Sequence, residues 1–276
     1  MEENPSTEFL ENFLLNYTGG EIKLLQTYYN EGIALLCINH VEKRNAITGK
    51  MLVDLRNCVL ELEKWENGKA VILYGEGIAF SSGGDLNFAR TENNPTSGFY
   101  MSYYAHDTLK RFRKLPFVTV SLVHGPALGG GAELAVYSDY VIVADDVKLG
   151  FVHGKMGIVS AWGGTTRLMR IVGERKALEM VLTSKIYSAK ECLDLGLAYK
   201  IVNSSIKLAE TLNFVRALTV HDYSIIQSNK NVTNFVSENS FEKSLDIERE
   251  QFYPKWGSKL NKEALDKRIK HVQNKN

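Results

Sequence analysis

The sequence contains few cysteines, and their spacing gives them no shared chemistry. Cys37, Cys58 and Cys192 are far apart in a chain of 276 residues, and no C-x-x-C pair occurs. A redox or zinc motif is therefore not indicated. We expect three buried, small apolar side chains in a protein of a reducing compartment.

Long apolar runs and an excess of one charge are also missing. No run approaches the roughly 18 apolar residues of a membrane span. The formal net charge is +1, so no global field attracts nucleic acid or an anionic membrane. The N-terminus is acidic and the first arginine is Arg44, which is the opposite of a mitochondrial presequence. We expect a cytosolic protein with no nucleic-acid or membrane partner.

Several catalytic motifs are absent as well. The six histidines form neither H-x-x-x-H nor H-E-x-x-H, so no metal site is predicted. No G-x-S-x-G occurs, and Ser81 or Ser82 with His153 and Asp85 makes a poor hydrolase triad. Neither G-x-G-x-x-G nor a Walker loop is present.

The remaining pattern alternates between strand and helix periodicity. Strands are expected at 22–28, 32–38, 70–74, 118–123, 140–144 and 198–202. Helices are expected at 8–17, 48–65, from about 101 to Pro116, 163–182 and 189–195. Such alternation predicts a largely parallel α/β core. Beyond residue 204 four helical stretches follow, at 206–219, 223–236, 240–252 and 260–272. We therefore divide the unit into a core with a leader helix, 1–203, and a helical C-terminal region, 204–276.

Two glycine-rich segments follow predicted strands. Gly129, Gly130 and Gly131 open an apolar helix that carries Glu133, and the segment 80–86 includes Gly83-Gly84. Glycines at such junctions let a ligand approach bare backbone amides, and the first amides of a helix have no internal partner. Each segment alone could be an ordinary tight turn, but together they can bind one oxyanion.

The spacing G-x3-GGG-x-E-x5-D, from Gly125 to Asp139, resembles the signature of the enoyl-CoA hydratase/isomerase (crotonase) superfamily. This resemblance implies a crotonase-like fold, in which turns of a ββα spiral stack into two roughly perpendicular sheets, followed by a helical C-terminal region. It implies that the oxyanion donors are the amides of Gly84 and Gly130. It also implies assembly into a homotrimer or hexamer.

The segment 149–168 resembles the second signature block of the superfamily, with two departures. Hydratases and common isomerases carry a glutamate where this chain has His153, and the usual proline is Ser160 here. Hydration of an enoyl thioester needs two carboxylates to hold and activate one water. Glu133 matches the first of these, but its partner is missing.

Phe151-Val-His153, together with Trp162, resembles a decarboxylase branch of the superfamily. This resemblance implies a lyase that converts ethylmalonyl-CoA and methylmalonyl-CoA to the acyl-CoA through a thioester enolate, as metabolite repair in fatty acid metabolism. The resemblance implies that no metal or organic cofactor is required. Coenzyme A is not counted as a cofactor, because it is part of the substrate. Trp162 and apolar neighbours are expected to surround the departing carboxylate partly, and His153 is expected to orient it or to deliver the proton afterwards. For Glu133 a structural role as an anion at a helix start is as plausible as a catalytic one.

The remaining substrate-binding residues follow from the same resemblance, and Lys43, Arg44 and Ala46 are expected near the coenzyme A nucleotide. The full set predicted to bind substrate is Lys43, Arg44, Ala46, Ser82, Asp85, Leu86, Gly129 and Trp162.

Two alternatives stay open at this point. One is an enoyl-CoA hydratase or isomerase that uses Glu133 alone. The other is a non-catalytic crotonase-like scaffold, such as an RNA-binding member with a lysine-rich helix. The helix at 48–65 mixes Lys50, Arg56 and Lys64 with acidic residues, so it carries no basic stripe.

Overall fold

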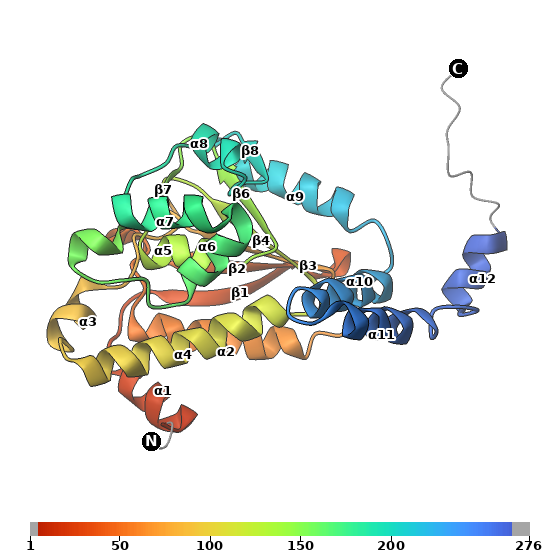
Figure 1. The fold of residues 1–276 in the computed structure, drawn as a ribbon, viewed down its shortest axis with the longest axis horizontal. Coiled ribbons are helices and arrows are strands. Elements are labelled where there is room, and N and C mark those ends of the chain that lie inside the picture. The colour runs from red at the N-terminus through yellow and green to blue at the C-terminus, as the bar shows by residue number, and fades with distance from the viewer. Residues whose placement is uncertain (1–4, 267–276) are drawn as a thin grey trace.

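The computed structural model describes residues 5–266. Its core is a β-sheet packed between helices, as in an α/β fold (Figure 1). Six strands are paired in the order β1-β2-β3-β4-β6-β8. β1 is antiparallel to β2, whereas the later neighbours are parallel. The predicted parallel core is confirmed. The strands are β1 (Glu21–Tyr28), β2 (Ile33–Asn39), β3 (Ala70–Gly75), β4 (Val118–Val123), β6 (Tyr140–Ala144) and β8 (Lys200–Val202).

Helices cover both faces of this sheet, so its inner strands β2, β3, β4 and β6 are buried on both sides, whereas the edge strand β1 is largely unburied. Side chains alternate between faces along a strand. Ala34 and Leu36 belong to the core formed with α2 (Gly49–Glu63) and α4 (Pro95–Lys114). Ile33 and Leu35 belong instead to a second core beneath α9 (Lys207–Leu218). All three cysteines are buried, as predicted.

A second, smaller sheet carries the glycine-rich loops. β5 (Pro126–Leu128) pairs in parallel with β7 (Lys148–Gly150). Single bridges extend this pairing, from Ser81 to Ala127 and from Ile47 to Gly84. The two glycine loops are thereby fixed side by side. A second sheet was expected, but three-residue strands are too short to show a period, so neither β5 nor β7 was predicted individually.

The helices agree with the predicted segments apart from a few breaks and short additions. The leader helix is present as α1 (Thr7–Leu15) and is capped by the Ser6 side chain. The expectation of one helix at 163–182 is wrong, because Gly173, with φ of 82°, separates α6 (Gly164–Val172) from α7 (Glu174–Thr183). Three short helices are α3 (Leu86–Thr91), α5 (Gly130–Ala135) and α8 (Ala189–Asp194); of these, α3 was not expected.

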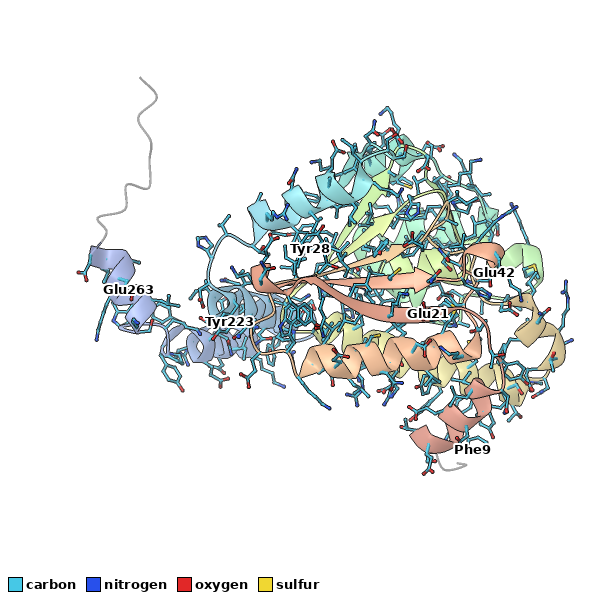
Figure 2. The ribbon with its side chains drawn as sticks, turned by 180° about the vertical axis from the view of Figure 1, so that it is seen from behind. Phe9, Glu21, Tyr28, Glu42, Tyr223 and Glu263 are labelled. Atoms are coloured by element: carbon cyan, nitrogen blue, oxygen red, sulfur yellow. The ribbon has the colours of Figure 1, made fainter. Side chains whose placement is uncertain are left out.

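The last helices form an arm that projects from the body. α10 (Tyr223–Val236) contacts β4, and α11 (Phe241–Phe252) packs against α10. α12 (Lys259–Asp266) lies farther out (Figure 1), and the predicted residues 267–272 of this helix lie outside the described residues. From behind, Phe9 on α1 and Glu263 on α12 mark opposite ends of the molecule (Figure 2). Between residues 5 and 266, no helix has the length and apolarity needed to cross a bilayer.

Asp139, the last residue of the glycine signature, joins the arm to the core. Its carboxylate accepts hydrogen bonds from the amide and hydroxyl of Thr119 at 2.9 and 3.0 Å and from Arg113 at 2.7 Å. It also pairs with Lys230 of α10. Burial lowers the pKa of Lys230 to about 8, although the charge of Asp139 opposes that shift. Asp139 therefore serves the fold, by neutralising cations between α4, β4 and α10.

Candidate active site

The amides of Gly84 and Gly130 are available for a ligand. The Gly83 carbonyl accepts a hydrogen bond from the Ile47 amide at 2.8 Å, and the Asp85 amide donates one to the Ile47 carbonyl at 2.9 Å. The Gly84 amide lies between these two bonds and has no acceptor among residues 5–266. The Gly130 amide is the first of α5 and likewise has no acceptor in the described chain. The loops approach closely, because a Cβ placed on Gly83 would lie 3.4 Å from the Gly130 nitrogen.

Both amides line a cavity of about 570 Å³. Every predicted site residue also lines it except Arg44, which the structure leaves outside the cavity wall. Arg44 is exposed and ends a short 3₁₀ turn with φ of 51°. Its carbonyl instead accepts the Ser82 amide at 2.9 Å, so it supports the glycine loop through its backbone.

Charged side chains at one end of the cavity neutralise each other. Lys43, whose side chain is 44% exposed, lies 3.2 Å from the carboxylate of Asp85. The same carboxylate caps α3 by accepting from the amides of Asn87 and Phe88. Burial raises the pKa of Asp85, but the hydrogen bonds from Lys43 and the two amides outweigh it and hold the pKa below its usual value.

Glu133 is a buried carboxylate whose two oxygens are fully occupied. One oxygen accepts from His153 Nε2 at 2.9 Å and from the Ala161 amide at 3.1 Å. The other accepts from the amides of Trp162 and Gly164 at 2.9 and 2.8 Å. The side chain is 1% exposed. A carboxylate in this state has no lone pair left to bind a water.

The structure places the Glu133 carboxylate at the start of a helix, but not of the helix that we expected. We expected its charge to act at the start of α5, near the Gly130 amide. The carboxylate instead reaches the first amide of α6, at Gly164, and the turn before it. Gly164 must be glycine for this contact, because a Cβ there would lie 2.4 Å from Glu133 Cγ.

Trp162 connects this anion to the oxyanion loop. Its amide binds Glu133, and its indole ring lies against Gly130, where a Cβ would approach the ring to 2.7 Å. The indole N–H donates to the sulfur of Met101 at 2.8 Å, and the Trp162 carbonyl accepts from the Tyr137 hydroxyl at 2.8 Å. The ring is thereby fixed as one wall of the cavity.

Other apolar walls come from residues that the sequence did not mark as functional. They are contributed by α1, α2, α3, α4 and the segment before Trp162: Leu14, Leu52, Phe88, Met101 and Ile158. Leu14, Leu52 and Met101 had helical apolar spacing as their only sequence signal, and this spacing also describes ordinary core residues. Phe88 lies on a helix that was not expected, and Ile158 was marked only as part of the segment that resembles the second signature block. Among residues 5–266, no group of three or more His, Cys, Asp or Glu side chains is placed to hold a metal, and the lack of a cofactor remains a prediction.

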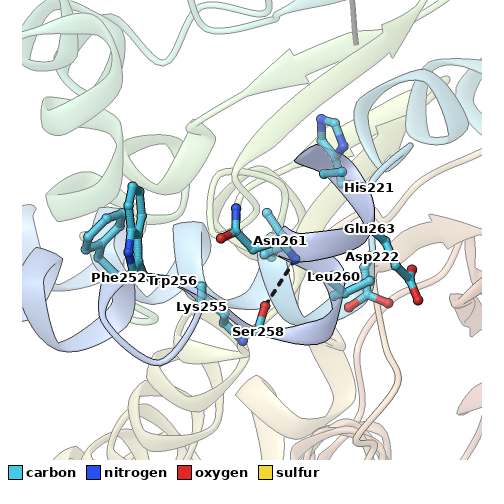
Figure 3. A pocket seen from close by; sticks show the side chains of 11 residues that line it. His221, Asp222, Phe252, Lys255, Trp256, Ser258, Leu260, Asn261 and Glu263 are labelled. Carbon is cyan, nitrogen blue, oxygen red and sulfur yellow. Dashed lines mark hydrogen bonds between the residues drawn. The ribbon is translucent and has the colours of Figure 1, made fainter. Parts of the chain in front are cut away.

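A second cavity, of about 450 Å³, lies in the C-terminal arm (Figure 3). Phe252, Lys255 and Trp256 line one part of it, and His221 and Asn261 line another. None of the predicted site residues contributes to it.

Comparisons with known proteins agree with this geometry. The family described as enoyl-CoA hydratase/isomerase matches residues 28–270. The chain belongs to this family. Curated relatives named ethylmalonyl-CoA decarboxylase are similar to almost all of it. The Xenopus laevis protein is 36% identical over 260 residues, covering 94% of this chain and 86% of its own. The Homo sapiens protein is 34% identical over 266 residues, covering 95% and 86%.

Solved structures confirm the crotonase-like fold. An enoyl-CoA hydratase from Thermoplasma volcanium superposes with a TM-score of 0.80 at 26% identity, covering 90% of this chain and 97% of its own. An enoyl-CoA hydratase from Bacillus anthracis gives a TM-score of 0.82 at 23% identity, covering 89% and 94%. The family match and the curated relatives named ethylmalonyl-CoA decarboxylase confirm the predicted resemblance to the superfamily and to its decarboxylase branch.

Replacing Glu133 with glutamine is expected to destabilise the fold. Either orientation of the amide places its NH₂ group against backbone N–H donors, and each buried unmet donor costs about 1–3 kcal/mol. We expect the free energy of unfolding to fall by about 2–5 kcal/mol in urea denaturation. Glu66→Gln, at an exposed position, should change it by less than about 0.5 kcal/mol. Equal stability of the two variants would contradict the structural role.

Proposed function

We propose that this protein is an acyl-CoA decarboxylase that removes CO₂ from ethylmalonyl-CoA and methylmalonyl-CoA. One observation carries the proposal. Two amides without an acceptor among residues 5–266 belong to the lining of a cavity in which the family's second glutamate is replaced by His153, and both oxygens of the remaining glutamate are occupied by hydrogen bonds. The curated relatives named ethylmalonyl-CoA decarboxylase support the same substrate class.

The amides of Gly84 and Gly130 would hold the thioester oxygen. When CO₂ leaves, the electrons of the breaking C–C bond pass into the thioester carbonyl, and the oxygen becomes an enolate oxygen. The donors then meet a charge that is larger in the transition state than in the substrate, which is the condition for catalysis. The departing carboxylate must stand perpendicular to the thioester plane for this transfer.

The surroundings of that carboxylate are apolar in this proposal. Trp162 and Met101 form adjoining parts of the wall, and Lys43 is engaged with Asp85. A strong cation on the carboxylate would stabilise the substrate more than the transition state. An apolar wall without such a cation therefore favours departure of CO₂.

His153 would complete the reaction by passing a proton taken from solvent through Nδ1 to the enolate carbon, because its Nε2–H is held by the Glu133 carboxylate. It lies on the 3₁₀ helix η3 (Val152–Met156), its side chain is 10% exposed, and Glu133 orients its ring through the 2.9 Å bond. A general acid must lie within hydrogen-bond reach of the atom that it protonates. In this scheme Glu133 positions the donor and makes no contact with the reacting atoms.

The proposal includes several properties that rest on the family resemblance. They are a cytosolic location, assembly as a homotrimer or hexamer, metabolite repair as the role, and coenzyme A bound near Lys43, Arg44 and Ala46 without a further cofactor.

The alternatives have weaker support. A hydratase or isomerase would need Glu133 to accept a proton, and its four hydrogen bonds oppose this. An RNA-binding scaffold would need a basic face, and α2 has mixed charges along its length.

The direct test is incubation with ethylmalonyl-CoA, methylmalonyl-CoA and crotonyl-CoA, with the products followed by mass. We expect both malonyl thioesters to lose the mass of CO₂ and crotonyl-CoA to gain almost no water. Robust hydration of crotonyl-CoA, with no loss of CO₂ from either malonyl thioester, would overturn the proposal.

The role of the amides can be tested at Gly84, where a Cβ would meet no atom within 4 Å. Gly84→Pro removes the N–H, whereas Gly84→Ala retains it and serves as the control. Losing one oxyanion donor typically lowers the rate by ~10²–10³. We expect the proline variant to be at least about a hundredfold slower than the alanine variant on ethylmalonyl-CoA. Equal rates in two folded variants would exclude Gly84 as a donor.

The role of His153 can be tested in D₂O. We expect wild-type enzyme to place deuterium on one face of C2 of the acyl-CoA. His153→Ala should lower kcat/KM by at least about tenfold, roughly 1.4 kcal/mol, and should lose this stereoselectivity. Lys155→Ala, exposed on the same 3₁₀ helix, is the control. Unchanged stereoselectivity in His153→Ala would assign the proton to another group.

A further inference from the structure

The N-terminal helix α1 contributes to the wall of the active-site cavity through Leu14. This side chain is fully buried and lines the cavity, although α1 is distant in sequence from both glycine loops. The family match begins at residue 28, after α1 has ended. This part of the wall therefore lies outside the segment that matches the family.

Several contacts fix α1 in its place. The Leu14 carbonyl is so close to Gly49 that a Cβ there would lie 2.2 Å from its oxygen. The Lys50 amide donates to the Tyr17 carbonyl at 3.0 Å, and the Tyr104 hydroxyl donates to Glu11 at 3.0 Å. The backbone at Leu14 therefore cannot shift without displacing the start of α2.

The residues that line the cavity differ in their exposure to solvent. Three lining residues, Lys43, Leu86 and Ile158, are between 44% and 57% exposed, and we call the part of the wall that they form the open end. Two other lining residues, Leu14 and Leu52, are 0% and 3% exposed, and we call their part of the wall the buried end. A thioester bound at the amides would direct its charged nucleotide outward, because the open end is solvated. Its small apolar substituent would then enter the buried end.

We propose that Leu14 sets the size of the 2-alkyl group that the site accepts. The inference rests on the proposed function, since it names the part of the cavity that would receive the ethyl group of ethylmalonyl-CoA. Close-packed interiors do not yield to added methylenes without strain. A longer alkyl chain must therefore displace the Leu14 side chain, and removal of that side chain should create room for it.

The expected size of the effect follows from burial of methylene groups. Each buried CH₂ contributes about 0.8 kcal/mol, which is roughly a fourfold change in binding or in kcat/KM. A Leu14→Ala cavity that accommodates two further methylenes should thus change the ratio of long to short substrates by about tenfold or more.

The test compares Leu14→Ala with Leu10→Ala. Leu10 is also buried on α1, at 2% exposure, but it does not line the cavity, so its loss weakens helix docking without changing the wall. The quantity to be measured is kcat/KM for methyl-, ethyl-, propyl- and butylmalonyl-CoA. Leu14→Ala should raise the butyl-to-methyl ratio at least about tenfold, and Leu10→Ala should leave it within about twofold. An unchanged ratio in Leu14→Ala, or an equal change in both variants, would overturn the inference.

A binding series separates this inference from the proposed reaction. Dissociation constants of propionyl-, butyryl-, pentanoyl- and hexanoyl-CoA are measured by calorimetry with the same variants. If wild type decarboxylates none of the malonyl thioesters but Leu14→Ala still favours hexanoyl-CoA, the proposed function fails and the size limit stands. If wild type decarboxylates and neither series shifts, the size limit fails alone. Leu14→Val, a smaller truncation, replaces the alanine variant should the latter not fold, with a smaller shift expected in the same direction.

Discussion

The arrangement of the site depends on one buried anion, the carboxylate of Glu133. Four hydrogen bonds connect it to His153 and to the amides of Ala161, Trp162 and Gly164. A buried charge is tolerated only when such bonds satisfy it. The positions of η3, of the turn before α6 and of the start of α6 are therefore interdependent, since each presents a donor to the carboxylate that α5 carries. Because the ring of Trp162 also lies on Gly130, this constraint extends to the oxyanion loop.

Close contacts explain why three consecutive glycines are needed, each for its own reason. Gly129 has φ of 54° and ψ of −121°, a conformation that side chains disfavour. Gly130 has no room for a Cβ beside Trp162, and Gly131 has none because a Cβ would lie 2.3 Å from the Ser81 carbonyl. The first glycine shapes the turn, the second admits the aromatic wall, and the third allows the two glycine loops to touch. Backbone amides can face a ligand here only because these side chains are absent.

Much of the fold could be predicted from periodicity, but shorter elements could not. The apolar spacing of α2 extends over several turns, whereas β5 has three residues and shows no period. The glycine loops and His153 could be found because each departs from an ordinary pattern. Leu14 could not, because an apolar residue on a helical stripe has the same sequence signal whether it faces a core or a cavity. The partners of Glu133 were also hidden, since backbone amides occur at every position and only the fold selects three of them.

Under the proposed function, the residue at position 153 determines the chemistry by whether it donates a hydrogen bond to Glu133 or can only accept one. An imidazole can donate to the carboxylate of Glu133, and it thereby occupies the last free acceptor site. A glutamate at that position would be a second acceptor and would leave both carboxylates in need of a shared donor, which a water supplies. A water held between two carboxylates is the reagent for hydration. With histidine at position 153, no acceptor site remains on Glu133 to hold this water. Glu133 then does not act as a base but fixes the position of the histidine ring. Hydration and decarboxylation can thus use the same oxyanion hole. They differ in the group that faces the carbon atom of the enolate, which is a water held by two carboxylates in one case and a histidine in the other.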